Sequence, residues 1–428
     1  MTKIGILGGG LAGLSLAYFL EKKGFATEVL ETETVCGGLC RSFNKDGFTY
    51  DLGGHIVFSK DESTLSLMVK MLGSNKKKLY RNNKVWFKRR FVKYPFENGL
   101  SALDKEDIAD CLLGFIDNRH AGKPHNFREW LYHTFGDGLA DKYLIPYNEK
   151  IWNCPTNKMG LEWVERVPKP PVADIVRSAL GIETEGYTHQ LYFYYPKRGG
   201  IQALTDAFRS KLSSVMTGFG VRSVRKAGRK WIVSDGNNDR EYDRIVSCLP
   251  LVDLVPMLDG VPSSIRSEAR GLKYNSLSVV MLGIDRKNLT DKFAVYFPQQ
   301  EFPFHRVCFH SYMGESYAPR GMSMAVAEIT TNPGDGVHEL SDRQLVEKVS
   351  SGLAREGFIR KGEVCASDVK RMKYAYVVTD LKYSKRLKRL RLYFRSIGLL
   401  LCGRFAEHEY LNMDAVIGRA RRLAGEIG

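Results

Sequence analysis

The sequence has no long hydrophobic run and no secretory leader. None of its apolar stretches approaches the roughly 18 consecutive residues that a membrane-spanning helix needs. Residues 2–7 enter a predicted strand directly, without the charged region and small-residue cleavage site of a signal peptide. We therefore expect a cytoplasmic protein without a transmembrane segment.

Cysteine is sparse and scattered, with eight in 428 residues, and only Cys36 and Cys40 lie close together. In a cytosolic chain of this length, such cysteines are expected to be buried thiols rather than a disulfide framework. The close pair has no second pair of cysteines and no histidines beside it to complete a tetrahedral site. The sequence therefore predicts no metal site.

Acidic residues are fewer than basic ones, 48 against 64, which gives a formal net charge of +16. A polyanionic partner, an anionic membrane surface or a phosphate-bearing ligand would each account for this excess. No helix-turn-helix, zinc-finger or RNA-binding signature accompanies the charge, so nucleic acid is not expected as a partner. The densest basic run, residues 382–395, is interleaved with leucines. It fits either a solvated helix face or contact with an acidic surface, and peripheral membrane contact stays open.

The length of 428 residues is too great for one ordinary core and indicates two domains. Strand, helix and strand periods over 3–7, 11–23 and 26–31 predict the opening of a doubly wound parallel sheet. Alternating patterns over 274–378 predict an antiparallel sheet. We expect an α/β fold in which a Rossmann-type domain formed by 1–75, 196–270 and 396–428 carries a substrate domain formed by 76–195 and 271–395, a helical insert plus the antiparallel sheet.

A glycine-rich turn follows the first predicted strand. Residues 8–13, Gly-Gly-Gly-Leu-Ala-Gly, satisfy the dinucleotide-binding pattern between a hydrophobic strand and an amphipathic helix. Gly8 permits the tight turn, Gly10 lets the backbone approach a pyrophosphate, and Gly13 allows close helix–sheet packing. The helix N-terminus then offers amide groups and the positive end of its dipole. Glu31, at the end of the second predicted strand, is placed to accept hydrogen bonds from the adenosine ribose.

The segment 36–41, Cys-Gly-Gly-Leu-Cys-Arg, resembles the glutathione-reductase-type flavoproteins, and within them the amine oxidase, protoporphyrinogen oxidase and UDP-galactopyranose mutase group. That resemblance implies FAD as the cofactor. Residues 221–224 are similar to the group's second FAD-contacting segment, and Gly403-Arg404 to the turn that brings a helix N-terminus to the flavin. The implied cofactor-binding residues are Gly8, Gly10, Leu11, Ala12, Gly13, Glu31, Gly37, Gly38, Arg41, Gly54, His55, Val224, Gly403, Arg404, Asn412 and Met413.

Several further segments resemble UDP-galactopyranose mutase in particular. They are the flavin-side loop 51–58, the segments 146–152, 166–168 and 195–200, and the stretch 403–414, which gives the nearest match. The resemblance implies a mutase that interconverts pyranose and furanose forms of a nucleotide sugar for polysaccharide biosynthesis, with the reduced flavin N5 as nucleophile. Pro-Phe-His-Arg at 303–306 is similar to the family segment whose arginine holds the diphosphate.

The implied catalytic residues are Arg306, His55 and Arg404, and the implied substrate-binding residues are Tyr147, Trp152, Arg166, Lys197, Arg306 and Tyr410. A bidentate guanidinium suits a leaving diphosphate. The family's second arginine is absent, because the sequence after Arg166 reads Val-Pro-Lys-Pro, and Lys169 or Lys197 would offer only a point charge in its place. Phe58 stands where the family has a second histidine.

Two other readings stay open. An FAD-dependent oxidoreductase of the amine oxidase or protoporphyrinogen oxidase type would remove hydride from its substrate, and an FAD-binding protein without catalysis would show no spectral change with substrate. An oxidase is expected to need an apolar cage with few anion-binding arginines. The basic composition therefore favours the sugar reading, although the fold alone does not choose. The oligomeric state is not predicted.

Overall fold

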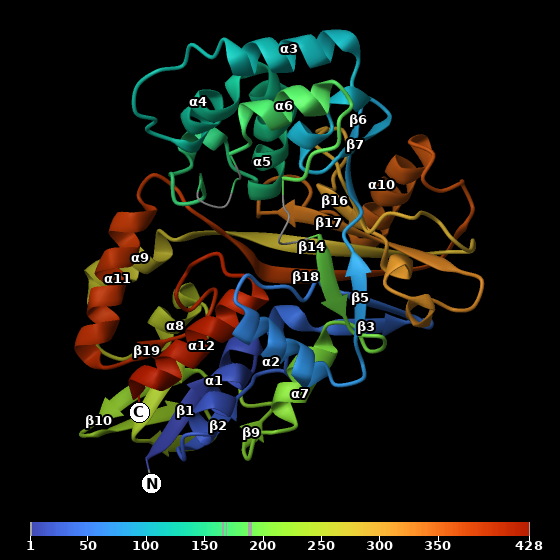
Figure 1. Ribbon diagram of the computed structural model, residues 1–428. Helices are drawn as coiled ribbons and strands as arrows, with labels where there is room; N and C mark the ends of the chain where they lie inside the picture. Colours follow the sequence, from blue (N-terminus) through green and yellow to red (C-terminus); the bar gives the residue numbers. More distant parts are fainter. Residues whose placement is uncertain (1, 165–166, 168, 187–190, 428) are drawn as a thin grey trace.

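A parallel sheet of five strands lies at the lower end of the molecule in Figure 1, a computed structural model that describes residues 2–427 except 165–166, 168 and 187–190. The strand order is β19-β13-β1-β2-β9, and every neighbouring pair is parallel. Its strands come from both ends and the middle of the chain: β1 (Lys3–Leu7), β2 (Ala26–Leu30), β9 (Val215–Met216), β13 (Arg244–Ser247) and β19 (Leu400–Leu401). The carboxyl ends of all five therefore meet at one edge.

Helix α1 (Leu11–Glu21) is apolar on almost every side because it lies between the parallel sheet and helix α12 (Met413–Ile427). After α1 the chain reverses direction at Gly24, where φ is +85°. Nearby lie helices α2 (Glu62–Leu72) and α7 (Gln202–Arg209) and an antiparallel three-stranded sheet of β10 (Ser223–Ala227), β11 (Lys230–Ser234) and β12 (Asp239–Tyr242).

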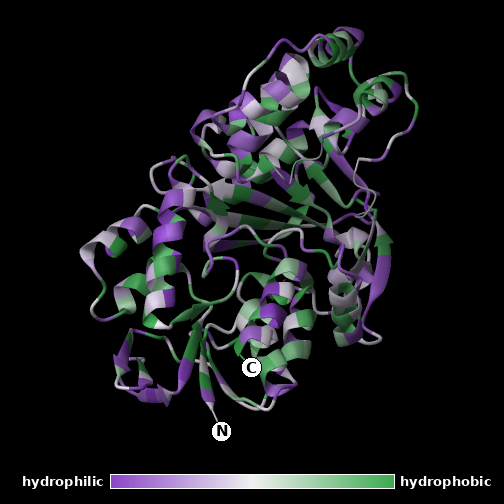
Figure 2. Ribbon diagram, turned by 60° about the vertical axis from the view of Figure 1, so that its left-hand side comes forward, coloured by the Kyte–Doolittle hydropathy of each residue, from purple (hydrophilic) through white to green (hydrophobic). Residues whose placement is uncertain are grey.

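A second, seven-stranded sheet crosses the middle of the molecule in the order β18-β14-β17-β16-β15-β6-β7. Figure 2 shows hydrophobic residues along its strands, and β14 and β17 are almost wholly buried. All its pairs are antiparallel except that of β15 with β6. The strands are β6 (Asn83–Phe87), β7 (Arg90–Lys93), β14 (Lys273–Ile284), β15 (Ala294–Tyr296), β16 (Arg306–Cys308), β17 (Ser323–Thr331) and β18 (Val364–Val378).

A layer of helices lies above this sheet in Figure 1: α3 (Lys105–Ile116), α4 (Phe127–Leu139), α5 (Ile145–Trp152) and α6 (Val172–Ala179), with a π-helical turn at Ala140–Leu144. Helices α3 and α4 cross closely because each has a glycine at the contact, Gly114 in α3 and Gly136 in α4. A Cβ on Gly136 would lie 1.8 Å from the Gly114 carbonyl oxygen. Any side chain at this position would push the two helices apart.

The remaining helices cover the sides of the two sheets: α8 (Leu251–Met257), α9 (Ser263–Arg270), α10 (Asp342–Arg355) and α11 (Tyr383–Ile397). Two short antiparallel pairs complete the strands: the hairpin of β3 (Ser42–Lys45) with β4 (Phe48–Asp51), and β5 (Lys77–Tyr80) with the distant β8 (Tyr192–Tyr195). Among the described residues, no helix combines the length and the apolar character needed to cross a bilayer.

The basic run 382–395 lies in helix α11 and its N-cap. Its buried side is Tyr383, Leu387, Leu390 and Phe394, and its lysines and arginines are exposed except for the half-buried Arg386. The helix contains no acidic residue, so the carboxylates that neutralise part of its charge come from other elements.

Candidate flavin and substrate site

Two glycine-rich turns meet at the carboxyl edge of the parallel sheet. Gly8 has φ +107° and ends β1, and a Cβ on Gly13 would lie only 2.0 Å from the Gly8 carbonyl oxygen. The second turn lies against the first: a Cβ on Gly38 would lie 3.3 Å from the Gly10 Cα, and Gly10 and Gly37 form an isolated parallel bridge. These glycines leave an open cradle at the N-terminus of α1, the kind of site that receives a pyrophosphate.

Glu31 follows β2 and points back towards the first turn. Its carboxylate accepts hydrogen bonds from the Gly9 N–H at 2.8 Å and the Glu33 N–H at 2.9 Å. The Phe219 N–H donates to the Glu31 carbonyl at 2.9 Å, so the segment after β9 runs beside this residue. Val224 lies further along, in β10, with its buried side chain opposite Val233 in a hydrophobic core.

The C-terminal segment reaches the same edge through Gly403. There φ is +109°, and a Cβ would lie 2.6 Å from the Ala12 Cβ at the start of α1. The Asn412 carbonyl accepts from the Val416 N–H at 2.9 Å, so Asn412 and Met413 open helix α12 beside α1. Arg41 lies near the second glycine turn and forms an ion pair with Glu33 at 3.5 Å.

His55 and Arg404 carry buried polar atoms without a hydrogen-bond partner among the described residues: Nδ1 of His55 and Nε of Arg404. The Arg404 guanidinium donates to the Ala375 and Leu411 carbonyls and lies 4.1 Å from the centre of the Tyr410 ring. Burial, reinforced by the charges of Arg306 and Arg404 and opposed by Glu328, lowers the pKa of His55 to about 4. His55 is therefore neutral at pH 7. With the open glycine cradle, these unpaired atoms fit a large, polar, planar group such as a flavin.

Arg306, at the start of β16, is held by a buried carboxylate that the sequence reasoning missed. Its Nε and Nη2 donate to Oε1 and Oε2 of Glu328 at 2.7 and 2.6 Å. Burial alone would raise the pKa of Glu328, but the charge and hydrogen bonds of Arg306 outweigh it and lower this pKa to about 2. Gly54 N–H also donates to Glu328 at 3.0 Å. The signal in the sequence was a single acidic residue inside the apolar run 323–331.

This pairing changes what Arg306 offers to a ligand. Two of its three nitrogens are committed to Glu328, and the paired charges largely cancel. Only Nη1 is left for an anion among the described residues, and the side chain is 21% exposed. The Tyr296 ring lies 5.9 Å from the guanidinium, and Tyr147 packs edge-on against Tyr296 at 5.5 Å. Tyr147 and Arg306 are thus brought together by Tyr296.

Trp152 belongs to an aromatic cluster beside Arg404. It is 2% exposed, and its ring lies 4.6 Å from Trp163, 5.8 Å from Tyr376 and 5.9 Å from Tyr410 in edge-on arrangements. Tyr376 and Trp163 were not singled out from the sequence, because their roles depend on strands and loops far apart in the chain.

The structure places the remaining described candidates, Lys197 and the alternative Lys169, against residues other than those above. Lys197 is exposed on the turn after β8, where its N–H donates to Asn75 at 3.0 Å. Arg166 lies outside the described residues. Lys169 lies over the ring of Trp130 at 5.7 Å.

Asp51 ends β4, just before the flavin-side loop, and is fully buried. It accepts hydrogen bonds from Ser42 Oγ at 2.6 Å, Tyr195 Oη at 2.5 Å and the Ile201 N–H at 3.1 Å. Burial raises the pKa of Asp51 to about 6, although all three hydrogen bonds act to lower it. The carboxylate joins the start of the loop to β8 and α7.

This raised pKa predicts a pH dependence of stability. The folded protein holds the Asp51 proton more tightly than the unfolded chain, so stability falls as pH rises between the ordinary value of 3.8 and about 6. A difference of two pKa units corresponds to about 3 kcal/mol. Urea unfolding from pH 4 to 7 should show this decline in the parent and a flatter profile in Asp51→Asn, whose amide retains the hydrogen-bonding shape. Identical profiles would contradict the assignment.

Comparisons with known proteins agree with this geometry. Family models of an NAD(P)-binding Rossmann-like domain and of flavin-containing amine oxidoreductases match residues 6–71 and 176–375. An uncharacterised protein of the nifH2 3′ region from Methanothermococcus thermolithotrophicus is 45% identical over 67 residues, 16% of this chain and 65% of that protein. A 4,4′-diapophytoene desaturase from Staphylococcus aureus is 37% identical over 160 residues, 36% of this chain and 29% of the desaturase. The chain thus spans less than two thirds of both relatives.

Solved structures match over the whole chain. A reduced UDP-galactopyranose mutase superposes with a TM-score of 0.92 at 25% identity, covering 100% of this chain and 95% of the mutase. A protein assigned as a protoporphyrinogen oxidase from Exiguobacterium sp. 255-15 gives a TM-score of 0.78 at 16% identity, covering 100% and 98%. The chain has the fold of the FAD-dependent amine oxidase superfamily. The predicted α/β fold class and the predicted FAD cofactor are confirmed, and the likeness to a UDP-galactopyranose mutase extends over the whole chain.

Proposed function

We propose that the protein is a cytoplasmic, FAD-dependent mutase that interconverts the pyranose and furanose forms of a nucleotide sugar. The observation that carries this proposal is the full-length likeness to a UDP-galactopyranose mutase, which includes the helical layer as well as the two sheets. The sequence segment 403–414, which gave the nearest resemblance to that family, lies at the flavin cradle and brings Arg404 and Tyr410 together. The particular sugar and nucleotide are part of what the experiment below determines.

When bound and reduced, FAD supplies a nucleophilic nitrogen, and the residues of this chain bind and orient the sugar around it. Neutral His55 offers a hydrogen-bonding imidazole without adding charge next to the flavin. Arg306 presents Nη1 to an anionic oxygen while Glu328 fixes its orientation. The rings of Trp152, Tyr376 and Tyr410 exclude water from this side. The chain therefore orients a polar substrate against an aromatic wall.

The proposal is tested with the purified holoprotein, reduced by dithionite under anaerobic conditions. It is incubated with UDP-galactopyranose, UDP-galactofuranose and a small panel of other nucleotide sugars, and the products are separated by chromatography. We expect interconversion with the reduced flavin and none with the oxidised flavin. Failure to convert any sugar in the panel would contradict the proposal.

The second candidate is an FAD-dependent oxidoreductase. The observation that favours it is the Arg306–Glu328 pair, because a neutralised arginine leaves the flavin side with less positive charge than diphosphate binding would use. The match of the amine oxidoreductase model to residues 176–375 points the same way. Anaerobic bleaching of the oxidised flavin by amines or porphyrinogens, together with no sugar interconversion, would assign the protein to this class.

A further inference from the structure

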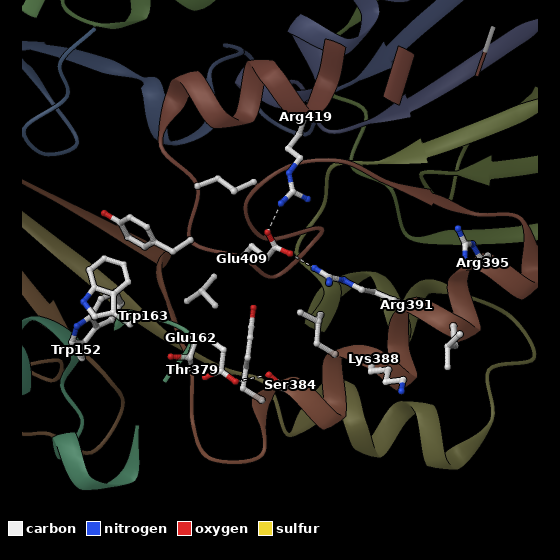
Figure 3. Close-up of a pocket in the computed structure, with 16 residues that line it drawn as sticks. Trp152, Glu162, Trp163, Thr379, Ser384, Lys388, Arg391, Arg395, Glu409 and Arg419 are labelled. Atoms are coloured by element: carbon white, nitrogen blue, oxygen red, sulfur yellow. Dashed lines mark hydrogen bonds and ion pairs between the residues drawn. The ribbon is translucent and has the colours of Figure 1, made fainter. Parts of the chain in front are cut away.

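A pocket of about 820 Å³ lies beside the aromatic cluster and is shown in Figure 3. One end is formed by Trp152, Trp163 and Tyr410, and the other by helix α11. Trp152 and Tyr410 are the two residues of this wall that the family resemblance assigns to substrate. The pocket thus lies between the aromatic cluster and the basic helix.

Four basic and two acidic side chains line this pocket. Glu409 pairs with both Arg391 and Arg419, and Glu407 pairs with Arg419 as well, so these four charges neutralise one another. Lys388 and Arg395 form no ion pair with any residue that the structure describes, and both are exposed. They lie seven positions apart on α11, two helical turns, and therefore on the same face. The helix end therefore carries the unpaired charges of Lys388 and Arg395, while the other lining carboxylate, Glu162, accepts a hydrogen bond from Ser384 at the start of this helix.

An anionic group of a ligand would complement the helix end of the pocket, and an aromatic or sugar moiety would suit the aromatic end. Of the two arginines expected to hold a diphosphate, one is absent and the other offers one nitrogen that is free among the described residues, Nη1, of a neutralised pair. Pro170 stands where the family has its second arginine, and Arg306 is neutralised by Glu328.

We propose that this pocket binds the phosphate groups of the nucleotide-sugar substrate. Lys388 and Arg395 contact the phosphate oxygens, and Trp163 and Tyr410 line the part that holds the base or sugar. The ligand class rests on the proposed function, but the binding does not require turnover.

The test measures binding of UDP to the FAD-loaded protein by calorimetry, with uridine as the probe that lacks phosphate. The variant is Lys388→Gln/Arg395→Gln, and the matched control is Arg343→Gln/Lys348→Gln, which removes the same charge from α10, away from the pocket. We expect the first variant to weaken UDP binding about tenfold or more, the loss of one to two charge-assisted contacts, and to leave uridine binding unchanged. The control should bind UDP as the parent does.

Flavin content and the midpoint of thermal unfolding should be the same in all three proteins, because the four substituted side chains are exposed. Equal UDP affinity in parent and α11 variant would overturn the proposal. So would an α11 variant that loses affinity only for phosphatidylglycerol vesicles, since the two cations would then contact lipid headgroups instead. A protein that converts no sugar but binds UDP through Lys388 and Arg395 would refute the mutase assignment and leave this site standing.

Discussion

Replacing Glu328 with glutamine should destabilise the protein by about 3–5 kcal/mol, the typical cost of leaving one member of a buried ion pair alone. Glu328 is 1% exposed and holds two nitrogens of Arg306 at 2.6–2.7 Å. Glutamine keeps the volume and one acceptor oxygen for the Gly54 and Arg306 Nε N–H groups, so the change removes the charge and the acceptor that faces Arg306 Nη2. The Arg306 guanidinium would then remain in the interior without its counter-charge. Urea or thermal unfolding at pH 7 gives the measurement.

The double variant Arg306→Met/Glu328→Gln is the control for this cost. It removes both charges, so it should be clearly less destabilised than the sum of the two single variants. The lowered pKa of Glu328 adds a second signature. Its stabilisation is present at neutral pH and is lost as pH falls from the ordinary 4.5 towards about 2, a loss that Glu328→Gln should not show. A single variant within about 1 kcal/mol of the parent, the range of a surface pair, would contradict a buried ion pair.

The parts of the site that could be predicted from the sequence are those set by local backbone geometry. Each of the two glycine turns, residues 8–13 and Gly37-Gly38, takes its glycines from a few consecutive residues, so its pattern is visible in the sequence. Apart from Lys273, strands β14 to β18 lie within 274–378, where alternating patterns predicted an antiparallel sheet, but β6 and β7 of the same sheet lie outside that range.

Contacts between distant segments were not predictable in the same way. Arg306 and Glu328 lie 22 residues apart on neighbouring strands, and only the register of β16 against β17 brings them together. Trp163 and Tyr376 meet Trp152 across a loop and a strand end. Arg306 was recognised as a candidate phosphate ligand from its own sequence neighbours, but its neutralisation depends on a residue outside that segment.

The substitution Gly403→Ala should cost about 2–5 kcal/mol and reduce the FAD content of the purified protein. Two effects add. An L-residue is strained at φ +109°, at about 1–3 kcal/mol, and the new Cβ would overlap the Ala12 Cβ, which lies 2.6 Å away. Relief of the overlap has to move either the turn after β19 or the first turn of α1. Both moves displace the cradle that the cofactor occupies.

The strain and the overlap can be separated with two further variants. Gly398→Ala also places alanine at a positive φ, +74°, but its Cβ meets nothing closer than Lys226 Nζ at 3.9 Å, so it should lose stability while keeping FAD. Ala12→Gly/Gly403→Ala removes the overlap and leaves the strain, so it should regain FAD relative to Gly403→Ala. FAD absorbance per polypeptide and the unfolding midpoint are measured for all four proteins. Equal FAD loss in Gly403→Ala and in the double variant would show that backbone strain alone displaces the cofactor, because the Ala12 contact would then contribute nothing.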